Sequence, residues 1–177
     1  MKKFVKISVL LGALLFVPQL AMAQDTSTGA LTVTATVDSS IKLSFESDLA
    51  GVSLTGSGTN AATLAFGAVS AFETIATSGV TRSVNGNTDF TVSSPFGVKV
   101  IQANSGSANY TLGAALGSPD TTNTWKINAT TLTGTSQDLG AAYTYGAATS
   151  HTVSLLVPQS ATASSISNTV NFTATAN

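Results

Sequence analysis

The segment Leu31-Thr32-Val33-Thr34-Ala35-Thr36-Val37 alternates apolar and hydroxyl residues without interruption. Successive side chains of a β-strand point to opposite faces, so one edge of this segment would be apolar and the other would carry hydroxyl groups. The pattern therefore predicts a strand, which either pairs within its own domain or adds to the open sheet edge of a neighbouring copy. The apolar edge consists of Leu31, Val33, Ala35 and Val37.

The residues that precede this segment have the three parts of a secretory signal peptide. Residues 1–6 are basic, residues 7–17 form an apolar stretch too short for a comfortable membrane span, and residues 21–23 read Ala-Met-Ala. We expect cleavage after Ala23, which removes residues 1–23. The mature protein is then expected to be secreted or displayed at the cell surface through the Sec route, without membrane insertion.

Charge and cysteine content exclude several classes of function. Charged residues make up 8% of the chain, against about 25% in ordinary soluble domains. Three of the seven cations leave with the signal peptide, so four remain against eight carboxylates, a formal charge of −4. No basic patch is left for nucleic acid or for an anionic membrane surface. Without cysteine, the remaining 154 residues have to be stabilised by their own core.

Short alternating runs continue through the rest of the chain, separated by clusters of Gly, Asn, Ser and Pro. The runs span residues 41–45, 64–66, 90–92, 98–101, 110–112, 125–129, 153–157 and 170–176. Residues 94–97, Ser-Pro-Phe-Gly, are interpreted as a turn between two of these strands. Because no segment after the signal peptide keeps a helical period, the pattern predicts an all-β antiparallel sandwich. We expect an N-terminal extension at residues 24–37 and the sandwich domain at residues 38–177.

Residues that could support catalysis are few. The chain has a single histidine, His151, and no Gly-x-Ser-x-Gly motif to present a nucleophile. Ser39 and Lys42 have the Ser-x-x-Lys spacing of penicillin-recognising enzymes but lack the companion motifs. Glu46 and Asp48 are interpreted as a solvated strand end rather than as a glycosidase pair. We therefore predict no catalytic residue and no enzymatic activity.

Metal and ligand sites are also sparse. Asn85, Asn87 and Asp89 offer alternating oxygen ligands, so calcium stays open, although the Asn-Gly step within them is independently a strong hairpin signal. We predict no cofactor and no zinc or redox-metal site, because the chain has no cysteine and one histidine. Tyr143 and Tyr145 share one strand face and are a candidate ligand face, for example for carbohydrate.

Several of these segments together resemble pilin subunits of the chaperone–usher type and the related spore-coat-U-like domains. The resemblance is carried by residues 30–37, Ile41-Lys-Leu-Ser-Phe45, Leu64-Ala-Phe-Gly67 and the last two runs, residues 157–161 and 169–176. It implies an incomplete immunoglobulin-like sandwich whose groove is filled by the N-terminal extension of a neighbour. This chain is a cysteine-free variant of that pattern.

The resemblance implies a structural subunit of an extracellular fibre or pilus-like appendage. Leu31, Val33, Ala35 and Val37 would form the donor strand, the main partner would be another copy of the chain, and a periplasmic chaperone or secretion machinery would be a second partner. The alternative is a monomeric secreted carbohydrate- or ligand-binding sandwich that uses Tyr143 and Tyr145. A third hypothesis is a secreted hydrolase with His151 as its base.

Overall fold

The structure, a computed structural model, describes residues 30–177, so the predicted signal peptide lies outside the described residues. Contacts divide the chain after Thr36, and residues 37–177 form one compact unit. None of the described residues lies in a helix. The strands are β1 (Ser40–Ser47), β2 (Thr81–Asn85), β3 (Asp89–Ala103), β4 (Tyr110–Leu116), β5 (Thr124–Ile127), β6 (Thr130–Thr131), β7 (Gln137–Tyr143), β8 (Ala148–Pro158) and β9 (Val170–Ala176).

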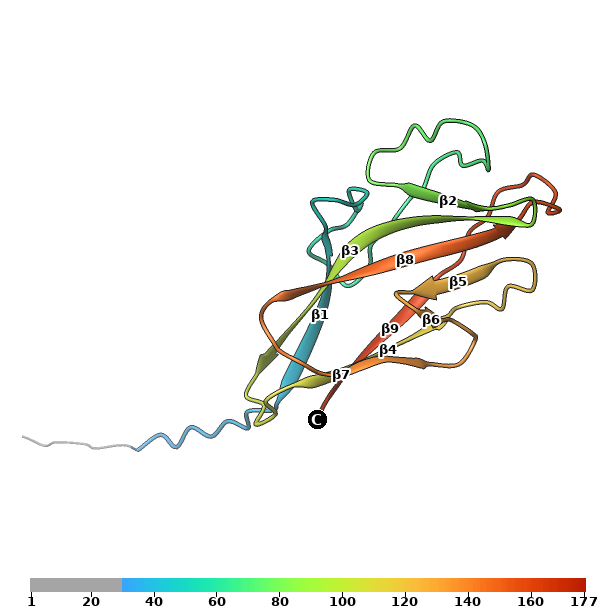
Figure 1. The fold of residues 1–177 in the computed structure, drawn as a ribbon. Helices are drawn as coiled ribbons and strands as arrows, with labels where there is room; N and C mark the ends of the chain where they lie inside the picture. Colours follow the sequence, from blue (N-terminus) through green and yellow to red (C-terminus); the bar gives the residue numbers. More distant parts are fainter. Residues whose placement is uncertain (1–29) are drawn as a thin grey trace, which may run out of the picture. The chain divides into compact units, whose positions relative to one another are not determined.

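Two antiparallel sheets form the layers of the domain (Figure 1). The larger sheet has the order β1-β3-β8-β5-β6, with β2 also paired to β3, and the smaller sheet has the order β7-β4-β9. The prediction of an all-β antiparallel sandwich is therefore confirmed. β1 begins three residues after Val37 and pairs with β3 at eight consecutive positions, from Ser40 opposite Ala103 to Ser47 opposite Phe96.

The core lies between the two sheets and follows the expected two-residue period. In β4 and β8 every second side chain is buried, and its neighbours along the strand are partly exposed. A fully buried aliphatic or aromatic side chain contributes roughly 1.5–3 kcal/mol, so this layer supplies the main stabilisation of a chain without disulfides. Its most buried apolar members are Val92, Val98, Val100, Tyr110, Leu112, Ala114 and Ile127.

The prediction of a turn at residues 94–97 is wrong, because β3 runs through them without a break. β2 covers the outer edge of β3 only up to Ser93, and β1 covers it from Phe96 onward. Pro95 lies in the gap between them, and its carbonyl oxygen points toward Gly51. The N–H and C=O positions of one strand residue point to the same side, so the missing N–H of Pro95 removes no hydrogen bond from the ladder to β8.

Candidate functional site

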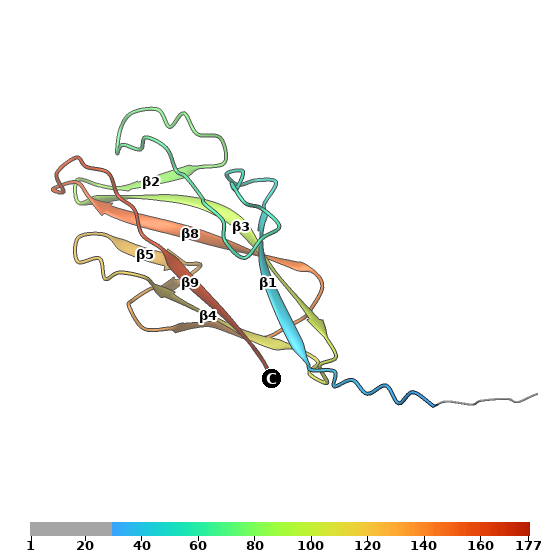
Figure 2. The same ribbon diagram turned by 180° about the vertical axis from the view of Figure 1, so that it is seen from behind.

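A groove lies between β1 and β9. Each of these strands ends its sheet, since β1 pairs only with β3 and β9 pairs only with β4 (Figure 2). The groove has a volume of about 1540 Å³. It is lined by Leu54, by residues 60–69 and 164–169, by Ile41, Lys42, Leu43 and Phe45 from β1, by Phe96, Trp125, Ile127, Val153 and Leu155 from the rest of the larger sheet, and by Val170, Asn171 and Phe172 from β9.

Three phenylalanine rings connect the two sheets beside this groove. The Phe172 ring of β9 meets Phe45 of β1 edge-on at a centroid distance of 5.3 Å, and Phe96 of β3 edge-on at 5.8 Å. The rings of Phe45 and Phe96 are tilted and 6.4 Å apart. Edge-to-face aromatic pairs contribute about 0.5–1.5 kcal/mol beyond the area they bury. The triad therefore holds β1, β3 and β9 at a defined spacing along the groove.

One wall of the groove is an extended segment, residues 60–69, which we call the strap. Ala62, Leu64 and Phe66 are half-buried and pack on the core, whereas the residues between them are exposed. The sequence predicts a strand at residues 64–66, but the strap has strand-like alternation without a ladder. Its only β-bridge joins Thr63 to Thr55, with N···O distances of 2.8 and 3.1 Å.

The predicted donor segment is exposed and lies in no strand. Leu31, Val33 and Val37 have exposed fractions of 89%, 81% and 70%, and Ala35 is exposed as well. Scattered exposed apolar residues are ordinary on a protein surface, but three large ones at alternate positions of one short segment are not. Their exposure leaves the apolar edge of the segment available to a binding surface.

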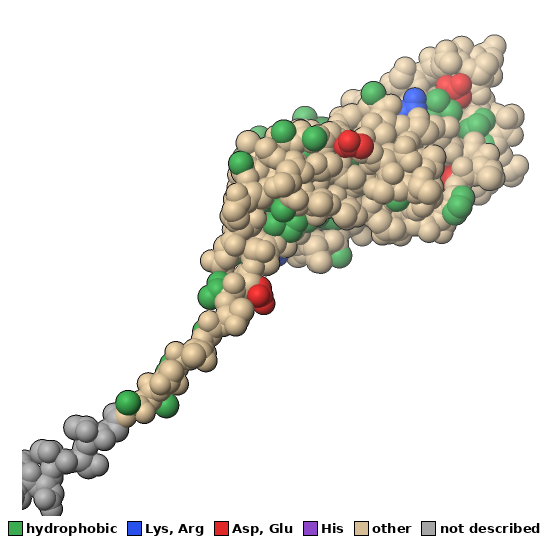
Figure 3. Space-filling model, turned by 90° about the horizontal axis from the view of Figure 1, so that it is seen from below, with side chains coloured by type: hydrophobic (Ala, Val, Ile, Leu, Met, Phe, Trp, Pro, Cys, Tyr) green, Lys and Arg blue, Asp and Glu red, His purple; other side chains and the backbone are tan. Residues whose placement is uncertain are grey.

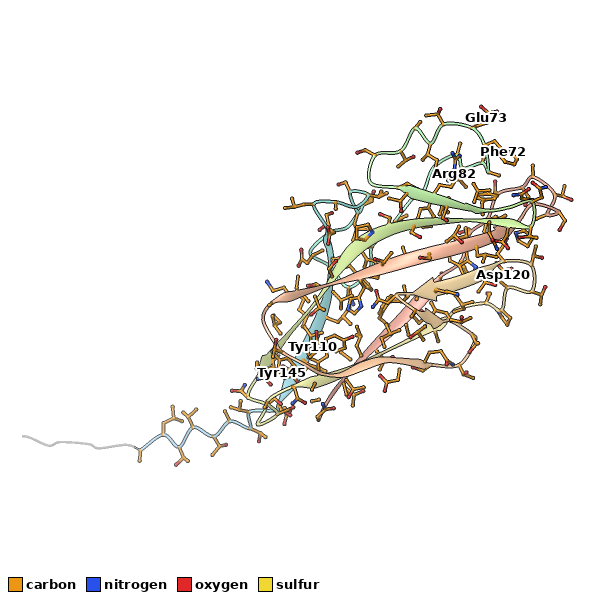
Figure 4. The ribbon with its side chains drawn as sticks, viewed as in Figure 1. Phe72, Glu73, Arg82, Tyr110, Asp120 and Tyr145 are labelled. Atoms are coloured by element: carbon orange, nitrogen blue, oxygen red, sulfur yellow. The ribbon has the colours of Figure 1, made fainter. Side chains whose placement is uncertain are left out.

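The two tyrosines of the candidate ligand face pack against a third, Tyr110. The ring centroids of Tyr143 and Tyr145 lie 5.5 and 5.2 Å from that of Tyr110, and Figure 4 shows Tyr110 and Tyr145 together. The hydroxyl of Tyr143 donates to the carbonyl of Leu139 at 2.8 Å, and that of Tyr145 donates to the carbonyl of Asn109 at 3.1 Å. Burial raises the pKa of Tyr110 and of Tyr143. These contacts favour a packing role, and a ligand face at this position stays a prediction.

His151 is buried between the sheets, with 2% of its surface exposed. The N–H of Thr152 donates to Oδ1 of Asn128, which leaves Nδ2 of Asn128 to donate to Nδ1 of His151 at 3.2 Å. The ring is therefore neutral with its proton on Nε2, and burial lowers its pKa. Its other neighbours are the rings of Phe96 and Tyr143. This environment lacks the hydroxyl and carboxylate partners that Ser-His-Asp chemistry requires.

The remaining candidate residues have local roles in turns. Asp48 accepts hydrogen bonds from the N–H of Ala50 at 2.9 Å and from the hydroxyl of Ser150 at 2.7 Å, and these bonds lower its pKa. Asn85 and Asp89 face each other at the base of the β2–β3 hairpin. Within residues 30–177, no three His, Cys, Asp or Glu side chains are grouped closely enough to hold a metal ion.

Asp120 organises the connection between β4 and β5, and this role of its carboxylate was not predicted from the sequence. Its carboxylate accepts hydrogen bonds from the N–H groups of Thr122 and Asn123, from the Asn123 amide and from Nε1–H of Trp125 at 2.8 Å. Burial opposes ionisation, but these donors outweigh it and hold the pKa of Asp120 at about 2. Asp120 also borders a second hollow of about 870 Å³, on which the exposed Phe72 lies.

A loop over this end of the domain is tied down by an arginine. Nη1 of Arg82 donates to the carbonyl of Ser70 at 2.8 Å and to the carbonyl of Glu73. Figure 4 shows Arg82 beneath the loop that carries Phe72 and Glu73, far from Tyr110 and Tyr145. The arginine contacts backbone carbonyls, so its role is to fix the loop rather than to bind an acidic side chain.

Comparisons with family models, with curated proteins and with solved structures found no match to this chain. Among the described residues, no helix is long and apolar enough to cross a membrane.

Proposed function

We propose that this protein is a secreted structural subunit of an extracellular fibre, in which each copy inserts residues 31–37 into the β1–β9 groove of the next. The observation that carries the proposal is the presence in one chain of two complementary parts. One is an exposed segment with an apolar edge, and the other is a groove with apolar side chains in its walls, bordered by the outer edge of β9. Strand addition to an open sheet edge is an established mode of peptide recognition.

The lengths of the two parts agree. The alternating segment has seven residues, from Leu31 to Val37. The free strand that it would join, β9, also has seven residues. At about 3.3 Å per residue, both extend for roughly 23 Å. The donor segment is therefore long enough to match β9.

The side chains of the two parts also suit each other. Leu31, Val33, Ala35 and Val37 would point into a groove whose lining includes aliphatic and aromatic side chains from both sheets, beside Lys42 and several Ser, Thr and Asn residues. Burial of one Leu or Val contributes roughly 1.5–3 kcal/mol. The three threonines would stay on the outer face, where hydroxyl groups are solvated. A shift of the register by one residue would bury the threonines instead, so the alternation also selects the register.

The contact would propagate into a filament. The donating segment and the accepting groove are different surfaces of the chain, and a head-to-tail contact of this kind extends unless its rotation closes a ring. Charged side chains on the face in Figure 3 are few and separated, so stacked copies would meet little electrostatic repulsion. The resemblance to pilins implies the same arrangement, with a neighbour's N-terminal extension in the groove.

The proposal is tested with two matched variants of the mature protein. Val33→Asp places a charge on the apolar edge, whereas Thr34→Asp places the same charge on the hydroxyl edge. Negative-stain electron microscopy and size-exclusion chromatography should show filaments for the wild type and Thr34→Asp, and monomers for Val33→Asp. Wild-type filaments should dissociate only on boiling in detergent, because full backbone pairing makes dissociation slow.

A deletion provides the second test. Removal of residues 24–37 should abolish filaments, and a synthetic peptide of the same residues should bind the shortened protein. Normal filaments from the deletion variant would contradict the mechanism. A wild-type protein that stays monomeric under all conditions would instead favour a self-complete binding module.

A further inference from the structure

We infer that the second hollow, which we call the Phe72 hollow, is a binding site for a neutral saccharide. Its volume of about 870 Å³ falls within the roughly 300–1,000 Å³ that small-molecule sites occupy. Its walls come from three places in the chain: the loop at residues 69–72, the connection at residues 120–123, and the segment at residues 159–167 between β8 and β9. None of these residues belongs to the donor segment, so the inference stands apart from the proposed function.

Phe72 presents its ring to solvent from a loop that is held in place. The side chain is 72% exposed. Oγ of Ser70 accepts hydrogen bonds from the N–H groups of Phe72 and Glu73, both at 3.2 Å, and Arg82 donates to the carbonyls of Ser70 and Glu73. The negative face of an aromatic ring attracts the C–H groups on one face of a sugar ring. A fixed and exposed phenylalanine at the rim of a hollow is therefore a stacking surface for a saccharide.

The charge of the lining indicates that the ligand is neutral. Within the described chain, no lysine or arginine lines the hollow, and Asp120 is its only charged residue. An anionic ligand would find no cation there and would be repelled by this carboxylate. Both oxygens of Asp120 already accept hydrogen bonds, Oδ1 from the N–H groups of Thr122 and Asn123 and Oδ2 from Nε1–H of Trp125. Because these bonds order the connection, the carboxylate has little capacity left for a cationic ligand.

The distribution of apolar and polar groups matches that of a sugar. Phe90 and Val157, both buried, contribute apolar surface to the hollow. A saccharide likewise carries C–H groups on the faces of its ring and hydroxyl groups around its edge. The hydroxyl groups that line the hollow belong to exposed side chains of Thr122, Thr162, Ser164, Ser165 and Ser167.

Two amide side chains at the hollow are fixed by hydrogen bonds and have an acceptor to offer. Nε2 of Gln159 donates to the carbonyl of Gly86 at 3.1 Å, which leaves Oε1 as an acceptor. Nδ2 of Asn123 donates to Oδ2 of Asp120 at 3.0 Å. Oδ1 of Asn123 is buried and has no hydrogen-bond partner within the described residues. A buried acceptor without a donor is unfavourable, and a sugar hydroxyl that enters beside Asn123 would supply the missing bond.

Binding is tested by NMR titration of the mature Val33→Asp protein. In this variant no donor strand should occupy the β1–β9 groove, which matters because Val69 and residues 164–167 line both hollows. The probes are glucose, galactose, mannose, N-acetylglucosamine, cellobiose and lactose. At least one should bind with a Kd of roughly 0.1–10 mM and shift the amide signals of the three walls. The absence of shifts with every probe at about 50 mM would overturn the inference.

An anionic sugar tests the charge argument. Glucose 6-phosphate should not shift these signals at concentrations at which the best neutral probe saturates, since no cation lines the hollow within the described chain. Binding of glucose 6-phosphate as tight as that of the best neutral probe would overturn the assignment to neutral saccharides.

Matched variants test the stacking surface. Phe72→Ala should raise the Kd about tenfold, because it removes the aromatic face, and Phe72→Trp should retain binding. Leu49→Ala should leave the Kd unchanged, since Leu49 is also exposed on a turn but does not line the hollow. The Tm of all three variants should equal that of the parent protein, because both side chains are exposed. The same Kd for Phe72→Ala and Leu49→Ala, or amide shifts centred on Tyr143 and Tyr145 instead, would overturn the inference and leave the proposed function intact.

Discussion

The two lateral sides of the sandwich differ in how they are closed. On one side, the chain passes from β5 through β6 to β7 and connects the sheets itself. The N–H of Leu116 donates to the carbonyl of Thr133 at 2.8 Å, and that of Leu132 donates to the carbonyl of Trp125 at 2.9 Å. Leu132 is buried on this side. On the other side, no such segment connects β1 to β9 within the described residues.

The difference shows in the burial of equivalent side chains. The inward-facing residues of β1 and β9, such as Leu43 and Phe172, are only half-buried, although they face the same core as the fully buried residues of β4. The open side thus has apolar side chains that are oriented correctly but only partly covered. The side chains on the open side are as apolar as those of the core but are partly exposed. A partner that binds there and covers them would therefore stabilise the folded protein.

The largest effect is expected on the closed side. Leu132→Ala should lower the free energy of unfolding by about 2–5 kcal/mol, because it leaves a cavity under a segment that its own backbone bonds hold in place. Denaturant unfolding of the monomeric Val33→Asp protein measures this value. Leu132→Ala should lower the free energy of unfolding by the same amount in filaments, because the closed side makes no contact with the donor strand.

The matched change on the open side should cost less in the monomer. Leu43→Ala removes the same atoms from a half-buried position, so we expect a loss of about 1–2 kcal/mol in the same Val33→Asp background. In filaments, the loss should increase, because the donor strand would bury Leu43 completely. Equal losses from Leu43→Ala and Leu132→Ala in the monomer would remove the distinction between the two sides.

Acid should destabilise the layer that both sides share, through His151. Burial lowers the pKa of this imidazole below its ordinary value of 6.5, so its contribution to stability is complete above about pH 6.5 and is lost as the pH falls. Protonation of Nδ1 would also place two donors against each other, because Asn128 donates to that atom. Thermal unfolding between pH 7.5 and 5 should show a falling Tm. His151→Gln should reduce the fall of Tm with pH. If Tm of this variant falls as steeply as that of the wild type, another titrating group causes the pH dependence.

The smallest effect is expected at Asp120. Its pKa is lowered to about 2, so its contribution is present above about pH 4 and is lost as the pH falls toward 2. Asp120→Asn should destabilise by about 1 kcal/mol or less, because Asp120 is only partly buried and water screens its hydrogen bonds. The difference in stability between wild type and Asp120→Asn should disappear near pH 2. A difference that persists there would mean that the amide disturbs packing around Trp125.

Strands that bury one face could be predicted from the sequence. Features that depend on which strand pairs alongside could not. The alternation at Val153, Leu155 and Val157 led directly to β8, because a two-residue period has one structural reading when one face is buried. The prediction of a turn at Pro95 was wrong because proline usually ends a strand. Here neither β1 nor β2 pairs with β3 at Pro95, so the strand tolerates a residue without an N–H group. That vacancy is a property of the tertiary structure.

The candidate groove could not be predicted from the sequence, for a similar reason. The donor residues could be named from their pattern, but the strap has the same pattern in Leu64 and Phe66 and does not form a ladder. β7 also escaped detection, because its positive φ angles at Gly140 and Ala142 break the period that identifies a strand. The alternation of apolar and polar residues indicates which face a segment would bury. Whether the segment becomes a strand depends on whether another strand lies beside it to pair with.

The short connection between the donor segment and β1 determines how a fibre would carry load. Only Asp38 and Ser39 separate Val37 from the first residue of β1. Tension on an inserted donor would therefore pass directly into β1 along its axis. The eight registered positions between β1 and β3 lie across that axis, so their hydrogen bonds would resist together in shear rather than open one at a time. A fibre built in this way would stretch little before its subunits yield.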